Sequence, residues 1–171
     1  MQSGIHVIKA NNQHTEGISK VCTDGYWATY GNSHPKKYIQ RIVDEFYNVD
    51  RISNEVTISN KHWGGYFVAV ENGNVIGAGG GGMIGDNEGE IFVLYIDPHR
   101  RNEGIGTMIL NAITEQQEGF GARKQWVSVQ KGNRKGIPFY EARGFNFKYE
   151  KPGYGNVKGE DFISLRYSRT V

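Results

Sequence analysis

The sequence predicts an α/β domain in which helices cover both faces of a mixed, mostly antiparallel sheet. Three observations support this fold class. The middle of the chain, Gly65–Asp97, is rich in β-prone residues and is divided by turn signals. Segments with apolar residues at helical spacing lie on either side of it. No repeat, proline-rich linker or charge block divides the 171 residues, so we expect a single domain over residues 1–171.

The first part of the chain predicts one strand followed by helices. Apolar residues alternate over Ile5–Lys9, as in a short strand. Helical spacing then covers Ile18–Tyr26 and, after a break at Gly31–Pro35, Ile39–Tyr47. Proline suits the first turn of a helix, which places the start of the second helix at this break. We also expect the segment Asp50–Ser59 to be helical.

The middle of the chain predicts three successive strands. These are Gly65–Glu71, Val75–Ile84 and Glu90–Asp97. The Asn72-Gly73-Asn74 sequence is a strong hairpin signal, and Asp86–Gly89 makes a second turn. The three strands should therefore pair with one another in chain order.

The last part of the chain alternates helices with strands. An amphipathic helix runs from Ile105 and is closed by Gly119, and a strand follows over Gln125–Gln130. A second helix is expected over Asn133–Arg143. The segments Phe145–Tyr149 and Phe162–Tyr167 are predicted to form a final antiparallel pair. The predicted order is β-α-α-β-β-β-α-β-α-β-β.

Composition excludes several classes of function. Lys and Arg number 20 against 18 Asp and Glu, a balance that does not favour nucleic-acid or membrane-surface binding. The apolar run Ile91–Ile96 is too short to cross a bilayer. The first ten residues show no secretory signal, and the single cysteine fits a reducing compartment, so we expect a cytoplasmic protein. The histidines show no metal-ligand spacing, and no metal is expected.

The run Gly77–Gly82 formally satisfies the glycine pattern of a dinucleotide site. That pattern requires a helix to open directly after it, whereas a turn into another strand follows here. We therefore reject a dinucleotide site. Glycines in this strand would let a neighbouring helix or a bound acceptor approach closely.

The segment Arg101–Gly106 carries the strongest chemical signal. It lies between a strand that ends at Asp97-Pro98 and an amphipathic helix. Unpaired backbone N–H groups at such a helix start, together with the helix dipole, favour a pyrophosphate. Gly104 and Gly106 lack a Cβ, so phosphate oxygens could approach the main chain. Taken alone, the segment could equally be a tight strand-to-helix loop.

A second motif follows at Asn133–Phe145. With Ile96-Asp97-Pro98 and Arg101-x-x-Gly104-x-Gly106 before it, the chain closely resembles the GNAT superfamily of acetyl-CoA-dependent N-acetyltransferases. Asn133 and the sequence Phe139-Tyr140-Glu141-Ala142-Arg143-Gly144-Phe145 match the second part of the family pattern. Gly136 departs from the alanine that is commoner there. The resemblance covers about residues 65–150, and the two motifs have the right order and spacing.

The resemblance implies a GNAT-like fold, acetyl-CoA as co-substrate, and a role for each matching residue. Backbone groups of Leu94, Tyr95 and Ile96 would hold the pantetheine and the thioester. Asn133 would bind the pantetheine arm, and Tyr140 would lie beside the thioester sulfur. The pyrophosphate would be wrapped by Arg101, Asn102, Glu103, Gly104, Ile105, Gly106 and Thr107.

The reaction implied is direct attack of an amine on the thioester. A primary amine is protonated at neutral pH and must first lose a proton, which a carboxylate acting through water can accept. Glu90 occupies a position used for this in some family members, although it could equally be a solvated strand-end carboxylate. A backbone N–H of the same strand would stabilise the oxyanion. Tyr140 would protonate the departing thiolate, unless it is simply a core aromatic.

The sequence leaves the acceptor open between a small-molecule amine and a protein amine. Several aromatic residues fall in the region where the family builds its acceptor pocket, and each could line that pocket or belong to the core. They are Tyr26, Trp27, Tyr30, Tyr38 and Trp63. Cys22 lies on an apolar helix face and is expected in the core. The oligomeric state is also open, with a homodimer as one option. The alternative function is a catalytically inactive CoA-binding regulatory module.

Overall fold

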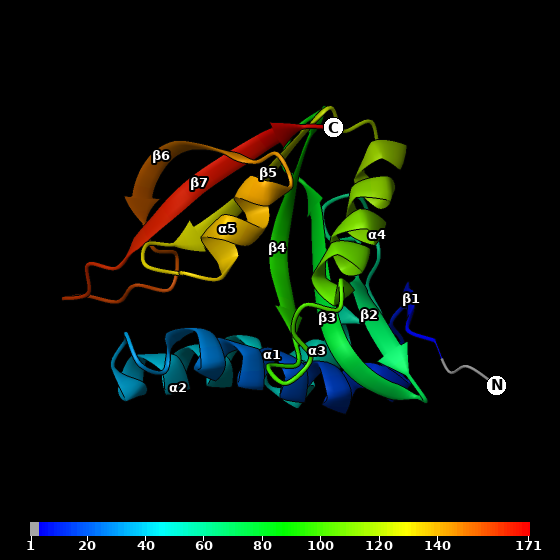
Figure 1. Cartoon of the computed structure of the whole chain (residues 1–171), viewed down its shortest axis with the longest axis horizontal. Helices are drawn as coiled ribbons and strands as arrows, with labels where there is room; N and C mark the ends of the chain where they lie inside the picture. The colour runs from blue at the N-terminus through cyan, green and yellow to red at the C-terminus, as the bar shows by residue number, and fades with distance from the viewer. Residues whose placement is uncertain (1–3) are drawn as a thin grey trace.

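The computed structural model describes residues 4–171, which form one seven-stranded sheet with helices on both faces (Figure 1). The strands are β1 (His6–Lys9), β2 (Tyr66–Glu71), β3 (Asn74–Met83), β4 (Glu88–Ile96), β5 (Lys124–Gln130), β6 (Asn146–Pro152) and β7 (Ile163–Thr170). The helices are α1 (Thr15–Tyr30), α2 (Lys36–Phe46), α3 (Val49–Glu55), α4 (Ile105–Gly119) and α5 (Gly136–Ala142), with a 3-10 turn at Asn12–His14. This confirms the predicted fold class. The observed order has one helix more than the predicted order, because α3 falls in the segment Asp50–Ser59, which was expected to be helical but was not counted in that order.

The strand order in the sheet is β1-β2-β3-β4-β5-β7-β6. Every neighbouring pair is antiparallel except β4 and β5, which run parallel. Their pairing covers Glu88–Ile91 against Lys124–Val127 and then stops, although β4 continues to Ile96 and β5 to Gln130. The two strands therefore separate at their carboxyl ends.

The two faces of the sheet carry separate hydrophobic clusters. The helices α1, α2 and α3 bury their apolar residues against one face, where Val68 and Ala78 lie. The helices α4 and α5 pack on the other face, against residues that include Ala69 and Ile76. Figure 1 shows α1–α3 together along the bottom of the view, and α4 and α5 above them. Cys22 is fully buried in the first cluster, as predicted.

The glycines of β3 allow close packing on both faces, as the sequence predicted for a neighbouring helix. A Cβ on Gly77 or Gly79 would lie 2.7 or 2.9 Å from Ile109 of α4. On the opposite face a Cβ on Gly80 would lie 2.7 Å from the Trp63 ring. The segment that contains Trp63 also bonds to β3, because the Gly64 N–H donates to the Gly81 carbonyl oxygen.

Two predicted helix boundaries are wrong. The helix expected over Asp50–Ser59 is α3, which begins at Val49 and ends at Glu55. The helix expected from Asn133 is α5, which begins at Gly136. The Asn133 side chain accepts a hydrogen bond from the Gly136 N–H at 2.8 Å, so Asn133 lies before the helix and binds its first amide.

Candidate active site

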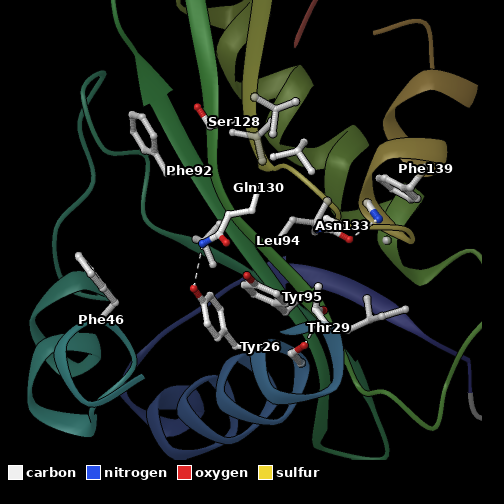
Figure 2. A pocket seen from close by; sticks show the side chains of 18 of the residues that line it. Tyr26, Thr29, Phe46, Phe92, Leu94, Tyr95, Ser128, Gln130, Asn133 and Phe139 are labelled. Atoms are coloured by element: carbon white, nitrogen blue, oxygen red, sulfur yellow. Dashed lines mark hydrogen bonds between the residues drawn. The ribbon is translucent and has the colours of Figure 1, made fainter. Parts of the chain in front are cut away.

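A cavity of about 480 Å³ opens where β4 and β5 separate. Figure 2 shows Leu94, Asn133 and Phe139 on one side of it and Phe46 and Phe92 on the other. Eight of the predicted catalytic and CoA-binding residues line it: Glu90, Leu94, Tyr95, Ile96, Arg101, Gly106, Asn133 and Tyr140. We call the part lined by Arg101, Gly106, Asn133, Phe139 and Tyr140 the motif half. The part lined by Phe46, Glu55, Trp63, Phe92 and Tyr154 is the aromatic half.

A β-bulge in β4 shapes the wall between the two halves. Gly80 pairs with Val93, and the next residue, Gly81, pairs with Ile91, so that Phe92 is the extra residue. Bulges bend a strand and redirect its side chains and backbone groups. Beyond the bulge, Leu94–Ile96 pairs with β3 along one edge. Within residues 4–171 the other edge has no strand partner and borders the cavity.

The start of α4 is built to receive an anion. Asn102 and Gly104 have positive φ angles of 63° and 78°, which curl the chain tightly before the helix. Within the described residues no side chain caps the first turn of α4. Backbone N–H groups of that turn and the positive end of the helix dipole therefore remain available to a ligand. A Cβ on Gly106 would lie 3.1 Å from Phe139, so this glycine also lets α5 approach α4 closely.

Five residues of the predicted pyrophosphate-binding set are outside the cavity lining: Asn102, Glu103, Gly104, Ile105 and Thr107. Ile105 is buried in the core. The Glu103 carboxylate accepts hydrogen bonds from Arg100, at 2.8 and 2.9 Å, and Arg100 also binds Glu71 at the end of β2. Arg100 lowers the pKa of Glu103 through these hydrogen bonds. The side chain of Glu103 therefore anchors the loop.

Thr107 is likewise engaged inside the protein. Its hydroxyl oxygen accepts hydrogen bonds from Nε and Nη2 of Arg143, at 2.8 and 2.6 Å. Arg143 also donates to the Phe139 carbonyl oxygen at 2.8 Å, and its guanidinium lies 3.9 Å from the Phe139 ring centroid. Arg143 thus joins the start of α4 to α5 and links the two sequence motifs.

Asn133 is held from two sides. Its side-chain oxygen accepts from the N–H groups that precede and begin α5, and its Nδ2 donates to the Tyr30 hydroxyl at 3.2 Å. One hydrogen on Nδ2 remains for a ligand. Nearby, Gln130 donates to the hydroxyls of Tyr26 and Tyr38, and its buried Oε1 has no hydrogen-bond partner among the described residues (Figure 2).

Tyr140 belongs to the motif half of the lining. Its side chain is 8% exposed and packs edge-to-face against Phe139 and Phe145. Burial raises the pKa of Tyr140 well above its usual value, and the positive charge of Arg143 offsets this only in part. The hydroxyl is therefore protonated at neutral pH.

Glu90 is not a free carboxylate. It accepts a hydrogen bond from Arg166 at 2.8 Å, and Arg166 also donates to the Ser128 hydroxyl at 2.9 Å. Both charged side chains are largely buried, with 7% of Arg166 and 15% of Glu90 exposed. The pair connects β4 to β7 beneath the opening between β4 and β5. The role of Glu90 as the base remains a prediction.

Sequence reasoning missed several residues of this site, among them Glu55, Phe92, Ser128, Gln130 and Arg166. Ser128 and Gln130 alternate with buried valines along β5. This alternation of polar and apolar residues was a signal for one strand face turned to a cavity. The aromatic residues Tyr26, Tyr30 and Trp63 line the cavity. Tyr38 is buried in the core instead.

Neither a metal site nor a membrane-spanning helix is found within residues 4–171. No group of three or more His, Cys, Asp or Glu side chains there could hold a metal ion. None of the helices in that range combines the length and the apolar character that crossing a bilayer requires.

Comparison with known proteins places the chain among acetyltransferases. The model of the acetyltransferase (GNAT) family matches residues 23–145. A spermidine N(1)-acetyltransferase of Thermoplasma acidophilum is 24% identical over 160 residues, which are 93% of this chain and 94% of that protein. A ribosomal protein bS18-alanine N-acetyltransferase of Escherichia coli is 30% identical over 60 residues, 35% of this chain and 40% of that protein.

Solved structures agree on the fold. The PaiA N-acetyltransferase of Thermoplasma acidophilum, solved in complex with coenzyme A, has a TM-score of 0.82 at 22% identity. The match covers 98% of this chain and 99% of that one. The ribosomal-protein-S18-alanine N-acetyltransferase of Escherichia coli has a TM-score of 0.70 at 14% identity, over 98% and 94% of the two chains.

Proposed function

The chain belongs to the acetyltransferase (GNAT) family, and we propose from this that it transfers the acetyl group of acetyl-CoA to an amine by direct attack. One observation carries the proposal. A single cavity joins the start of α4, the separated ends of β4 and β5, and the Tyr140 side chain. A thioester bound in the motif half would thus face an acceptor in the aromatic half.

The motif half suits the donor. Backbone N–H groups at the start of α4 would bind the pyrophosphate, and Arg101 would add a positive charge at the cavity wall. The remaining hydrogen of Asn133 Nδ2 would bind the pantetheine arm. The free edge of Leu94–Ile96 would hold the pantetheine and present an N–H to the developing oxyanion.

The proposed reaction uses Glu90 and Tyr140, the two residues to which the family resemblance gives catalytic roles. Glu90 accepts a proton from the acceptor ammonium through a water molecule, and the neutral nitrogen attacks the thioester carbonyl carbon. Because Arg166 binds Glu90 at 2.8 Å, the carboxylate is held in a fixed orientation. The C–S bond then breaks, and the sulfur leaves as a thiolate. The products are the acetylated amine and CoA.

Tyr140 is the proposed acid. Its buried hydroxyl is protonated at neutral pH and can donate a hydrogen bond, and then a proton, to the departing sulfur. Its high pKa makes it a weak acid, so the hydrogen bond to the developing negative charge is the larger part of its contribution.

The names of the relatives support an amine acceptor but include both a small molecule and a protein. One is named for spermidine, a small amine, and another for an alanine of a ribosomal protein. We propose that the acceptor here is likewise an amine that reaches the thioester through the aromatic half.

The proposal is tested by calorimetric titration with acetyl-CoA and by thiol release with an amine panel. Arg101→Ala should weaken acetyl-CoA binding about tenfold or more, because hydrogen bonds to charged groups contribute about 1.5–3 kcal/mol. Arg123→Ala is the matched control, since Arg123 is exposed in the turn after α4 and does not line the cavity. Acetyl-CoA binding without thiol release for any amine would favour the inactive CoA-binding module.

A further inference from the structure

Glu55 is a carboxylate in the aromatic half that has an oxygen without a hydrogen-bond partner among the described residues. It is the last residue of α3 and lines the cavity, with 25% of its side chain exposed. Its Oε1 is buried and has no hydrogen-bond partner among residues 4–171. Burying a carboxylate oxygen without a hydrogen-bond partner costs free energy, and a bound ligand can supply the missing partner when the oxygen lies at a cavity wall.

The one cation paired with Glu55 is Arg51, one helical turn earlier. The Arg51 Nε lies 3.4 Å from Glu55 Oε2, longer than the 2.7–2.9 Å typical of a strong charged hydrogen bond. Arg51 is 42% exposed, and its guanidinium lies 4.6 Å from the Phe46 ring centroid. Burial raises the pKa of Glu55, and the charge of Arg51 together with hydrogen bonding from Arg51 and the Tyr66 hydroxyl offsets this only in part. The carboxylate therefore has capacity for another positive partner.

Aromatic rings line the same half of the cavity. Trp63 stacks with Phe92 at 6.5 Å and contacts Tyr66 edge-on at 5.1 Å, and Phe46 contacts Tyr154 at 5.4 Å between centroids. The Trp63 indole N–H donates to the Glu55 carbonyl oxygen at 2.9 Å, which fixes this ring at the end of α3. Ring faces beside a carboxylate bind organic cations. The position of Arg51 over Phe46 already shows one cation stabilised there.

We infer that Glu55 and these rings bind a second, non-reacting ammonium group of the acceptor, so that the substrate is a small diamine or polyamine. The attacking nitrogen must be neutral when it reacts, and its proton is already assigned to Glu90 on β4. Glu55 lies on α3, a different wall of the cavity. An ammonium group of the acceptor bound at Glu55 would therefore stay protonated throughout the reaction. The inference rests on the proposed function, because it assigns the acceptor of that same site.

Lys151, from β6, is a further cation of the cavity lining. Figure 1 shows β6 in the upper part of the view and α3 in the lower part. Repulsion from Lys151 therefore favours an acceptor ammonium on the α3 side, where the Glu55 carboxylate, only partly neutralised by Arg51, attracts it.

A comparison of two amines of equal length tests the inference. We would measure kcat/KM for 1,4-diaminobutane and for 1-aminobutane with the wild-type protein, with Glu55→Gln and with the control Glu115→Gln. Glu115 is an exposed residue of α4 outside the cavity lining. The wild type and the control should prefer the diamine about ten- to a hundredfold, the range expected for a hydrogen bond between charged groups. Glu55→Gln should abolish that preference by raising KM for the diamine alone.

Either of two results would overturn the inference: no preference for the diamine in the wild type, or a preference that Glu55→Gln retains. Calorimetric titration of the CoA-loaded protein with the diamine gives a second readout that needs no turnover. Binding that Glu55→Gln weakens supports the inference, and binding that it leaves unchanged contradicts it. Failure of the proposed function is distinguishable, because it would appear as absent acetyl-CoA binding or absent thiol release with every amine.

Discussion

The motif half and the aromatic half of the cavity are built in opposite ways. In the motif half, the Asn133 side chain is bound by Tyr30 and by the start of α5, which leaves one of its hydrogens for a ligand, and next to the cavity lining the Thr107 hydroxyl is bound by Arg143. What it leaves for a ligand is largely backbone, at the start of α4 and along β4. In the aromatic half, the ligand-facing groups are side chains, and the Glu55 carboxylate is incompletely satisfied.

This difference suits the motif half to binding the donor and the aromatic half to binding the acceptor. Backbone groups fixed by short motifs suit a donor that is the same throughout a family. Side chains brought together from several elements can change without disturbing the fold, and they suit an acceptor that varies. Variants in the motif half should therefore affect every acceptor equally, whereas variants in the aromatic half should affect some acceptors and leave others unchanged.

The largest expected effect is that of Tyr140→Phe, in the motif half. Loss of the hydroxyl should lower kcat about a hundredfold or more, the usual contribution of a general acid. The fall should be the same for every acceptor, and the Kd of acetyl-CoA should hardly change. Steady-state kinetics together with calorimetry measure both quantities. Unchanged turnover would show that Tyr140 is not the acid.

Arg143→Leu should have the next largest effect. The change removes the hydrogen bonds that join Thr107 on α4 to Phe139 on α5. We expect acetyl-CoA binding to weaken about tenfold and the protein to lose about 1–2 kcal/mol of unfolding free energy, because partly buried hydrogen-bond partners are left unsatisfied. Calorimetry and urea unfolding are the measurements, and Arg123→Leu is the exposed control. A loss confined to one acceptor would contradict the division between the halves.

The smallest effect concerns pH. Burial raises the pKa of Glu55, so its negative charge is lost at a higher pH than for an exposed glutamate. As pH falls through that raised pKa, KM for a diamine should rise, whereas KM for a monoamine should not follow the same step. Glu55→Gln should remove the step. A pH profile of the KM ratio is the measurement, and an identical step in the variant would exclude Glu55 as its source.

The sequence predicted the motif half better than the aromatic half, for a physical reason. Gly104, Asn133 and Tyr140 belong to two contiguous motifs, so local spacing was enough to indicate them. Local spacing did not indicate that Thr107 would be bound by Arg143, because the two residues are 36 positions apart. The sequence therefore did not show that the Thr107 side chain anchors α4 to α5; the pyrophosphate-binding role of residues 101–107 stays a prediction.

The aromatic half combines residues of α2, α3 and β4 with residues of the segments after α3 and β6. Glu55 was simply one residue of an expected helix, and nothing nearby in sequence marked it as buried beside Trp63 and Tyr66. Phe92 faces the cavity because of a bulge, which depends on the register of β3 against β4. Register and long-range packing are properties of the folded chain, and neither is encoded in a short motif.

Everything proposed for this protein depends on acetyl-CoA binding in the cavity at the separated ends of β4 and β5. Calorimetric titration of the folded, purified protein with acetyl-CoA measures that binding. We expect one site in the micromolar range, weakened by Arg101→Ala and unchanged by Arg123→Ala. A folded protein that releases no heat of binding, and that acetyl-CoA does not stabilise against thermal unfolding, would contradict it.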